Sequence, residues 1–149
     1  MKMISRKPPF AENELLFVYG TLLSGLSNHH HMQGATCLGP ATMQGALFDL
    51  GDYPAMKLLG DRAAPLGTVL GELYKIEASQ WQRLDDLEEV DPESMANSMY
   101  LRVTADVTWL ATESPQAVRA QVYVYNWSLE GRPPIKNGDF RRHISLKKA

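Results

Sequence analysis

The sequence predicts one α+β domain, built on a mixed, mostly antiparallel, barrel-like sheet with one main helix. The length of 149 residues suits a single domain. Several short apolar segments and two long alternating segments predict strands, whereas only one segment carries clear helix signals. So many strands around a single helix favour a sheet that curls or closes on itself.

The N-terminal part of the chain predicts a tail followed by a buried strand. Residues 1–13 are polar, charged and proline-containing, which is typical of a flexible tail, and residues 14–149 are then the domain. The apolar run "LLFVY" predicts a buried strand that ends in a turn at Gly20. The segment "GLSNHHHM" that follows is expected as a loop or a short helix.

Three further strands and the main helix are expected in the middle of the chain. The strand candidates are "ATMQGALFDL", "YPAMKLL" and "TVLGELYKI", separated by turns rich in glycine and aspartate. In "ASQWQRLDDLEEV", Ser79 and Gln82 have the spacing of a capping box, which predicts that a helix begins there. Asp91 precedes Pro92, and this pair predicts the end of the helix.

Two long strands are predicted after the helix. The segment "YLRVTADVTW" places apolar residues from Leu101 to Trp109 on one face, and "VRAQVYVYNW" repeats the alternation. The segment between them, "ATESPQA", is expected as a hairpin loop. The C-terminal "RRHISLKKA" is basic, which is typical of a solubilising tail.

Composition argues against several classes of partner. The formal net charge of −2 gives no electrostatic reason to expect nucleic acid or an acidic membrane. No apolar run is long enough for a signal peptide or a transmembrane helix, and one cysteine, Cys37, favours a reducing compartment, so we expect a cytoplasmic protein. The three adjacent histidines from His29 lack acidic or thiol ligands at metal-binding spacing, so no metal site is expected there. The oligomeric state is not indicated.

One carboxylate in the acidic run "LDDLEEVDPE" differs from its neighbours. On a helical wheel, Glu88 falls between Trp81 and Leu84 on the apolar stripe, whereas Asp86 and Glu89 point toward solvent and Asp85 is borderline. Burial of a carboxylate raises its pKa, which suits a general acid or base. Two other interpretations are that the helix frays before Glu88 or that Glu88 pairs with Arg102.

The segment "VYGTL" is the second candidate for a functional site. Gly20 allows a tight turn at the end of the strand and a close approach of a ligand to the backbone. Consecutive N–H groups in such a turn can bind an anion, and Tyr19 and Thr21 add hydroxyl groups. Glycines in this position also occur for structural reasons alone.

The order of motifs resembles a known family. "YGTL", "GDYPA", "GELY", "LDxLE", "YxR" and "NGD" follow one another over residues 15–140 as they do in the γ-glutamylcyclotransferase-like family, which includes AIG2-like proteins and γ-glutamylamine cyclotransferases. The resemblance implies that Glu88 is the catalytic acid/base. It also implies that the glutamyl end of the substrate is held by the "YGTL" loop, namely by Tyr19, Gly20, Thr21 and Leu22.

The resemblance also implies a reaction and, through the "GDYPA" match, a role for Tyr53 in the pocket, while the strand positions suggest further wall residues. The substrate is expected to be a small γ-glutamyl amine or peptide, whose α-amine attacks its own γ-carbonyl to give 5-oxoproline and a free amine without a cofactor. The expected pocket walls, each of which packing could also explain, are Tyr53, Tyr100, Arg102 and Tyr125.

One departure from the family keeps two alternatives open. The family usually has glycine after the catalytic glutamate, and this chain has Glu89. The extra charge leaves room for a non-catalytic binding or regulatory protein of the same fold. A hydrolase in which Glu88 activates water is the other alternative, and the products separate them: 5-oxoproline from cyclisation, glutamate from hydrolysis.

Overall fold

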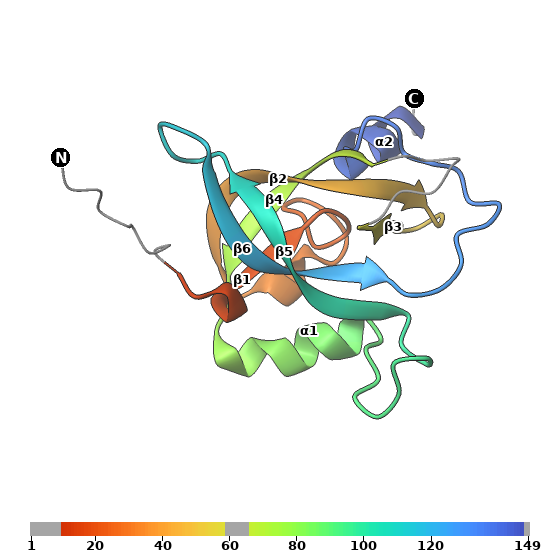
Figure 1. The fold of residues 1–149 in the computed structure, drawn as a ribbon, viewed down its shortest axis with the longest axis horizontal. Helices are drawn as coiled ribbons and strands as arrows, with labels where there is room; N and C mark the ends of the chain where they lie inside the picture. The colour runs from red at the N-terminus through yellow and green to blue at the C-terminus, as the bar shows by residue number, and fades with distance from the viewer. Residues whose placement is uncertain (1–9, 59–65, 148–149) are drawn as a thin grey trace.

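The computed structural model describes residues 10–58 and 66–147, whose strands join in one six-stranded sheet. The strands are β1 (Leu15–Val18), β2 (Thr36–Asp49), β3 (Pro54–Lys57), β4 (Gly67–Lys75), β5 (Tyr100–Trp109) and β6 (Gln116–Tyr125). Their order is β3-β2-β4-β1-β6-β5, and a further pairing of β2 with β5 closes the sheet into a barrel (Figure 1). The predicted α+β class with a barrel-like sheet is confirmed.

Long strand β2 makes the closure possible. It pairs with β3, β4 and β5 along its length, always antiparallel, while β1 and β6 pair in parallel. The pairing of β2 with β4 shifts between Cys37 and Gly39, and Gly39 has a φ of 107°. Such a bulge bends a strand and increases its twist, so β2 can follow the curve of the barrel.

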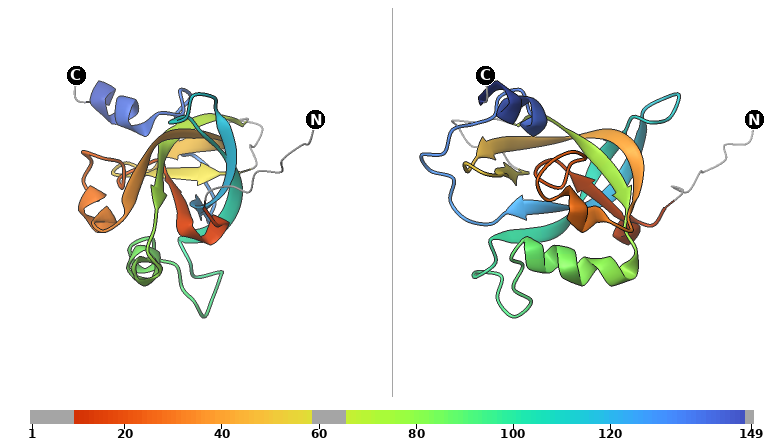
Figure 2. Two further views of the ribbon diagram at one scale, coloured as in Figure 1. Left: turned by 90° about the vertical axis from the view of Figure 1, so that its left-hand side faces the viewer. Right: turned by 180° about the vertical axis from the view of Figure 1, so that it is seen from behind.

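Helix α1 (Trp81–Leu87) follows a 3-10 turn, Ala78–Gln80, and lies against the outside of the barrel (Figure 2). The observed cap differs from the predicted one because Gln80, and not Gln82, accepts a hydrogen bond from the Glu77 N–H at 2.9 Å. The predicted end at Asp91 is also wrong, because the helix stops at Leu87.

A second helix, α2 (Phe140–Lys147), was not expected from the basic C-terminal segment. Its first residue, Phe140, is 1% exposed and belongs to the barrel core, and Ile144 packs against the same core one turn later. The Asp139 carboxylate accepts the Arg142 N–H at 3.0 Å at the start of the helix. Figures 1 and 2 place α2 on the opposite side of the barrel from α1.

Apolar side chains form two clusters, one inside the barrel and one outside it. Strand β1 supplies both: Leu15 and Phe17 belong to the inner cluster, whereas Leu16 and Val18 belong to the outer one. Both faces of β1 are therefore buried, which explains its unbroken apolar run. The outer cluster also buries tyrosines of β5 and β6 that the alternating pattern assigned to a polar face, namely Tyr100, Tyr123 and Tyr125.

The segment expected as a tail is partly described. Residues 1–9 lie outside the described residues, but Phe10 packs edge-on against Trp109 with ring centroids 6.4 Å apart. The short 3-10 helix Glu12–Glu14 follows, and Gln121 donates to the Glu12 carbonyl at 3.3 Å. The division into a tail and a single domain at residue 14 stays a prediction. In the described part of the chain, each helix is too short or too polar to cross a membrane.

Candidate active site

A pocket of about 170 Å³ opens where the end of β1, the start of β3, the start of β5 and the end of α1 meet. It brings together the two candidate features of the sequence, the "YGTL" loop and Glu88. Its lining consists of residues 17–22, Asn28, Tyr53, Pro54, residues 87–89, Met99, Tyr100 and Tyr123.

Glu88 is the residue at the C-terminal end of α1, and its N–H still donates to the Leu84 carbonyl at 3.0 Å. The residue is partly buried, and burial, followed by the negative charge of Glu89, raises the pKa of its carboxyl group from 4.5 to about 7. Among the described residues, no lysine, arginine or histidine forms an ion pair with Glu88. The carboxyl group is therefore poised to gain or lose a proton near neutral pH.

The turn after Glu88 ends α1 in a Schellman motif. Val90 donates its N–H to the Asp85 carbonyl at 2.9 Å, and Glu89 donates to the Asp86 carbonyl at 3.1 Å. Glu89 has a φ of 54°, a left-handed conformation that glycine adopts without strain and other residues do not. The position at which the resembled family usually has glycine is thus one where the backbone favours glycine.

The loop after β1 lines the pocket and carries backbone N–H groups without a partner among the described residues. Leu23 donates to the Gly20 carbonyl at 3.0 Å, which makes a tight turn, and Asn28 donates its backbone and side-chain N–H groups to Thr21 at 2.9 Å each. No hydrogen bond among the described residues uses the N–H groups of Gly20, Thr21 or Leu22. Successive free N–H groups of this kind suit an anionic ligand.

Gly20 is needed for a close approach to β3. Its φ lies outside the left-handed region, but a Cβ atom added to it would stand 2.7 Å from Cγ and 2.8 Å from Cδ of Pro54. Real Cβ atoms do not come this near to a neighbour. The first residue of β3 therefore presses directly on the loop that carries the free N–H groups.

Tyrosines form much of the pocket wall. The Tyr19 hydroxyl donates to the Tyr123 carbonyl at 2.5 Å, and the Tyr100 hydroxyl donates to the Pro54 carbonyl at 2.7 Å. Burial raises the pKa of Tyr19 and of Tyr100, and the charge of Glu88 raises both further. Both hydroxyls therefore stay protonated at neutral pH and hold the walls through the bonds they donate.

Sequence comparison decides the family. The chain matches the profile described as "Gamma-glutamyl cyclotransferase, AIG2-like" over residues 16–142. The chain belongs to this family. The AIG2-like match spans the pocket, α1 and the six strands apart from Leu15, so the resemblance seen in the motifs is confirmed.

Some relatives of this AIG2-like chain are named for an enzymatic activity, and others are named only as members of the family. It is 34% identical over 113 residues to the γ-L-glutamyl-butirosin B γ-glutamyl cyclotransferase of Niallia circulans, covering 74% of this chain and 66% of that protein. It is 31% identical over 127 residues to the γ-glutamylcyclotransferase family protein YtfP of Escherichia coli K12, covering 84% of this chain and 94% of that protein.

Solved structures of AIG2-like and related proteins share the fold. YkqA from Bacillus subtilis superposes with a TM-score of 0.69 at 27% identity over 91% of this chain, which spans 42% of YkqA. A mouse AIG2-like protein superposes with a TM-score of 0.62 at 26% identity, over 85% of this chain and 88% of the mouse protein.

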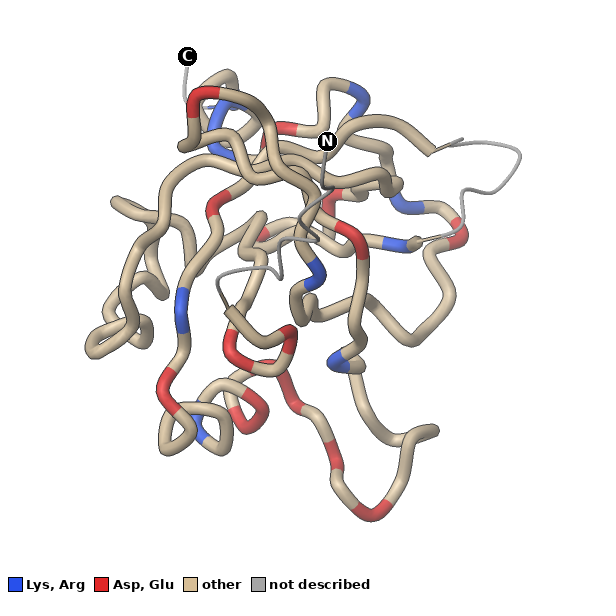
Figure 3. Tube along the Cα trace, turned by 60° about the vertical axis from the view of Figure 1, so that its left-hand side comes forward, with Lys and Arg blue, Asp and Glu red and all other residues tan. Residues whose placement is uncertain are grey.

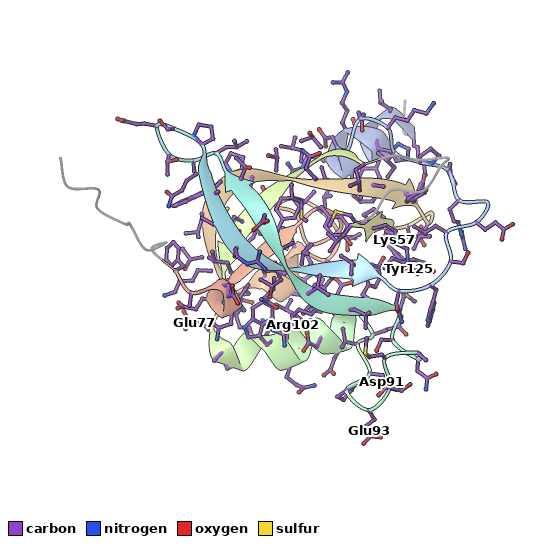
Figure 4. All side chains as sticks on the ribbon, viewed as in Figure 1. Lys57, Glu77, Asp91, Glu93, Arg102 and Tyr125 are labelled. Atoms are coloured by element: carbon purple, nitrogen blue, oxygen red, sulfur yellow. The ribbon has the colours of Figure 1, made fainter. Side chains whose placement is uncertain are left out.

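Arg102, an expected pocket wall of this AIG2-like chain, lies outside the pocket lining. Its Nε is 3.1 Å from the Asp85 carboxylate, and its guanidinium stacks over Trp81 at 4.3 Å (Figure 4). Asp85 also accepts the Tyr123 hydroxyl at 2.6 Å. Arg102 therefore holds α1 against the sheet and neutralises Asp85, not Glu88.

Tyr125, a second expected wall, also lies behind the lining. It is 9% exposed, and its ring packs edge-on against Tyr100 at 5.5 Å. Lys57 donates to its carbonyl at 2.7 Å (Figure 4). Tyr53 lies at the pocket mouth, 37% exposed, where its hydroxyl approaches the Met99 sulfur at 3.8 Å.

Tyr123 and Asn28 line the pocket but were not among the predicted site residues. Tyr123 could have been found, because it shares a strand face with Tyr125 and that face turned out to be buried. Asn28 carries no signal in the sequence, since its place depends on the fold of the loop after Thr21.

Among the other acidic residues of the run "LDDLEEVDPE", Asp86, Glu89 and Glu93 are exposed and Asp91 is partly exposed, whereas Asp85 is paired with Arg102. Figure 3 shows acidic positions on α1 and in the loop that follows it, and Figure 4 places Asp91 and Glu93 in that loop, away from the barrel.

His29 belongs to a 3-10 helix, His29–Met32, and its Nδ1 lies 2.9 Å from the Leu22 carbonyl. Over residues 10–58 and 66–147, no cluster of side chains could hold a metal ion.

Two substitutions of Glu89 are expected to separate its charge from its backbone strain. Glu89→Gln removes the charge that raises the Glu88 pKa, so the acid limb of any Glu88-dependent pH profile should move to lower pH. Glu89→Gly should do the same and also raise the free energy of unfolding by about 1 kcal/mol, because glycine adopts the left-handed turn freely.

Urea unfolding and a pH titration of the two variants check this expectation. If Glu89→Gly is no more stable than Glu89→Gln, the left-handed turn costs the native chain nothing. An unmoved pH profile in both variants would show that the charge of Glu89 does not reach Glu88.

Proposed function

We propose that this chain is a γ-glutamylcyclotransferase that converts a γ-glutamyl amine or peptide into 5-oxoproline and the free amine, with Glu88 as the acid/base. One observation carries the proposal: a carboxyl group with its pKa raised to about 7 lines the same pocket as Gly20, Thr21 and Leu22, whose backbone N–H groups have no hydrogen-bond partner among the described residues. The family membership of the chain and the enzymatic name of the butirosin relative support it.

The glutamyl end of the substrate is anchored by the loop of Gly20, Thr21 and Leu22. The described residues that line the pocket include no lysine, arginine or histidine, so a carboxylate there would meet neutral donors, among them the backbone N–H groups of the loop. Such N–H groups bind an anion without bringing a mobile charge near Glu88. The pocket therefore offers separate places for the α-carboxylate and for the proton transfer.

Ring closure needs little more than a fixed conformation of the substrate. The α-amine and the γ-carbonyl belong to one molecule, and well-oriented intramolecular reactions reach effective molarities on the order of 10⁵ M or more. The walls of Tyr100 and Tyr123 are rigid because their hydroxyls are engaged in hydrogen bonds. They hold the glutamyl chain in the folded form from which the five-membered ring closes.

Glu88 moves protons in turn from the entering nitrogen to the leaving one. The substrate α-amine arrives as an ammonium group and cannot attack until it loses a proton, which ionised Glu88 accepts. The amine attacks the γ-carbonyl carbon, and the C–N bond to the leaving amine breaks as Glu88 returns the first proton to that nitrogen. The ring nitrogen loses its second proton to Glu88 as the lactam forms, and the released amine takes up this proton and leaves as an ammonium group. A pKa near 7 suits both transfers, because neither protonation state is strongly favoured.

The departing amine faces the open end of the pocket. Tyr53 and Glu89 are both exposed there, and Met99 lies beside Tyr53. These three side chains would contact the part of the substrate that differs from one γ-glutamyl compound to another, and they set which amine is accepted.

Mass spectrometry of the products from a mixed set of γ-glutamyl amines and peptides tests the proposal. We expect 5-oxoproline and the free amine in equal amounts. Release of free glutamate instead would identify a hydrolase in which Glu88 activates water. Saturable binding of 5-oxoproline with no product from any compound would identify a non-catalytic binding protein.

A further inference from the structure

Ser24 follows the pocket loop and is held by two side chains from distant parts of the chain. Glu72 of β4 accepts the Ser24 N–H at 2.9 Å and the Ser24 hydroxyl at 2.7 Å, one on each carboxylate oxygen. Arg141 of α2 donates to the Ser24 carbonyl at 2.8 Å and lies 3.5 Å from the Glu72 carboxylate. Ser24 is thus bound through its N–H, its carbonyl and its hydroxyl.

The acceptor at the centre of this cluster is ionised. Burial alone would raise the pKa of Glu72, but the hydrogen bonds from Ser24 and Tyr74 and the charge of Arg141 outweigh burial and hold the pKa below its usual value. Hydrogen bonds to an ionised carboxylate are shorter and stronger than those between neutral groups. The cluster is therefore a firm attachment and not a surface ion pair alone.

The position of Ser24 lets this attachment act on the pocket. Leu23 closes the tight turn over Gly20, and Ser24 comes directly after it. The N-terminal end of the turn follows strand β1, which is paired in the sheet as far as Val18. Residues 20–22 therefore connect strand β1 to Ser24, and both of these are held by hydrogen bonds. Movement of Ser24 would move the backbone N–H groups of residues 20–22.

We propose that Glu72 and Arg141 are a positioning pair, which sets how well the backbone N–H groups of residues 20–22 bind the glutamyl end of the substrate. This inference rests on the proposed function for the identity of the ligand. Neither side chain lines the pocket, so the pair acts through Ser24. Helix α2 thereby takes part in substrate affinity from outside the site.

Arg141→Met should not disturb folding, because 47% of the Arg141 side chain is exposed to solvent. We expect the KM for a γ-glutamyl substrate and the Kd for 5-oxoproline to rise about tenfold, as loss of about 1.4 kcal/mol would cause. The kcat and the pH midpoint set by Glu88 should stay unchanged. Arg142→Met is the matched control, because the Arg142 side chain makes no hydrogen bond or ion pair within the described part of the chain.

Glu72→Gln tests the other half of the pair. The amide keeps the size of the side chain but turns an acceptor oxygen into a donor that faces the donors of Ser24, so a larger rise in KM is expected. Because both side chains act through Ser24, the double variant should show less than the product of the two single effects.

The inference is overturned if the KM and the Kd of Arg141→Met equal those of Arg142→Met while the wild type turns over substrate. It is also overturned if the pH midpoint moves with the KM, since the pair would then act on the chemistry. A wild type that forms no product counts against the proposed function. Amide hydrogen exchange then decides: faster exchange at Leu23 and Ser24 in Arg141→Met than in Arg142→Met supports the pair, and equal exchange overturns it.

Discussion

Glu88→Gln is expected to abolish 5-oxoproline formation, with kcat lowered by at least about 10³-fold, because acid–base catalysis of this kind contributes about 10²–10⁴-fold. Glutamine keeps the size of the side chain but can neither accept a proton from the α-amine nor return one to the leaving amine. The variant should still bind 5-oxoproline, since the loop N–H groups are untouched. Steady-state kinetics and calorimetric binding measure the two properties separately.

Stability gives an independent sign that the fold is kept. The Glu88 pKa of about 7 lies above the ordinary value of 4.5, so between these pH values the native protein holds a proton that the unfolded chain has released. The contribution of Glu88 to stability is therefore full at low pH and declines as the pH rises toward 7. Glutamine does not titrate, so the variant should gain stability relative to the wild type between pH 5 and pH 8 in urea unfolding.

Asp86→Asn is the matched control for this substitution. Asp86 is exposed two residues before Glu88 on the same helix and accepts a hydrogen bond only from Gln82 among the described side chains. Its loss should leave kcat within about twofold of wild type. Undiminished turnover by Glu88→Gln would remove Glu88 from the mechanism, whatever its pKa.

The sequence predicted Glu88 as the catalytic residue partly from its position inside a helix, and the structure changes where that helix ends. The wheel assumed a helix running to Asp91 with Glu88 in the middle of its apolar stripe. The helix instead stops at Leu87, and Glu88 faces the pocket because its N–H still completes the last turn to Leu84. The periodicity was right over the turn that mattered, and the Schellman turn that ends the helix was hidden because Glu89 replaces the expected glycine.

Barrel closure and the second helix show what pattern can and cannot predict. The six strands were visible as apolar segments, but the pairing of β2 with β5 depends on a bulge whose position no local signal marks. Helix α2 did carry a signal: Asp139 as a cap and the four-residue spacing of Phe140 and Ile144. The surrounding basic residues led instead to the prediction of a tail. A short polar helix is stabilised mainly by its contact with the core, and that contact is not visible in the local sequence.

Arg102 and Tyr125 show why pocket walls are harder to predict than a pocket's chemistry. Both lie on the strands expected to line the site. Arg102, however, forms an ion pair with Asp85, and the ring of Tyr125 packs against Tyr100. Which of two neighbouring side chains on one strand reaches a cavity depends on what packs from outside the sheet. That information resides in contacts between segments far apart in the chain.

Gly20→Ala is expected to lower kcat/KM by about 10²-fold. The added methyl group would meet the Pro54 ring at 2.7 Å, so the loop, the start of β3 or both must move. Misplacement of about 1 Å in a binding group can cost about 10²-fold in rate, and the displaced segment carries the N–H groups proposed to anchor the substrate. Overpacking should also lower the free energy of unfolding by about 1–3 kcal/mol.

A second substitution separates the clash from a general loss of stability. Pro54→Ala removes the two ring carbons that the new methyl group would meet, while its carbonyl can still accept the Tyr100 hydroxyl. The double variant should therefore recover much of the activity lost by Gly20→Ala. Gly67→Ala, in β4, adds a carbon that no described atom approaches within 4 Å, and this variant should retain wild-type activity. If the double variant is no more active than Gly20→Ala, contact with Pro54 is not what makes glycine necessary, and the free space beside Gly20 is then required by the substrate itself.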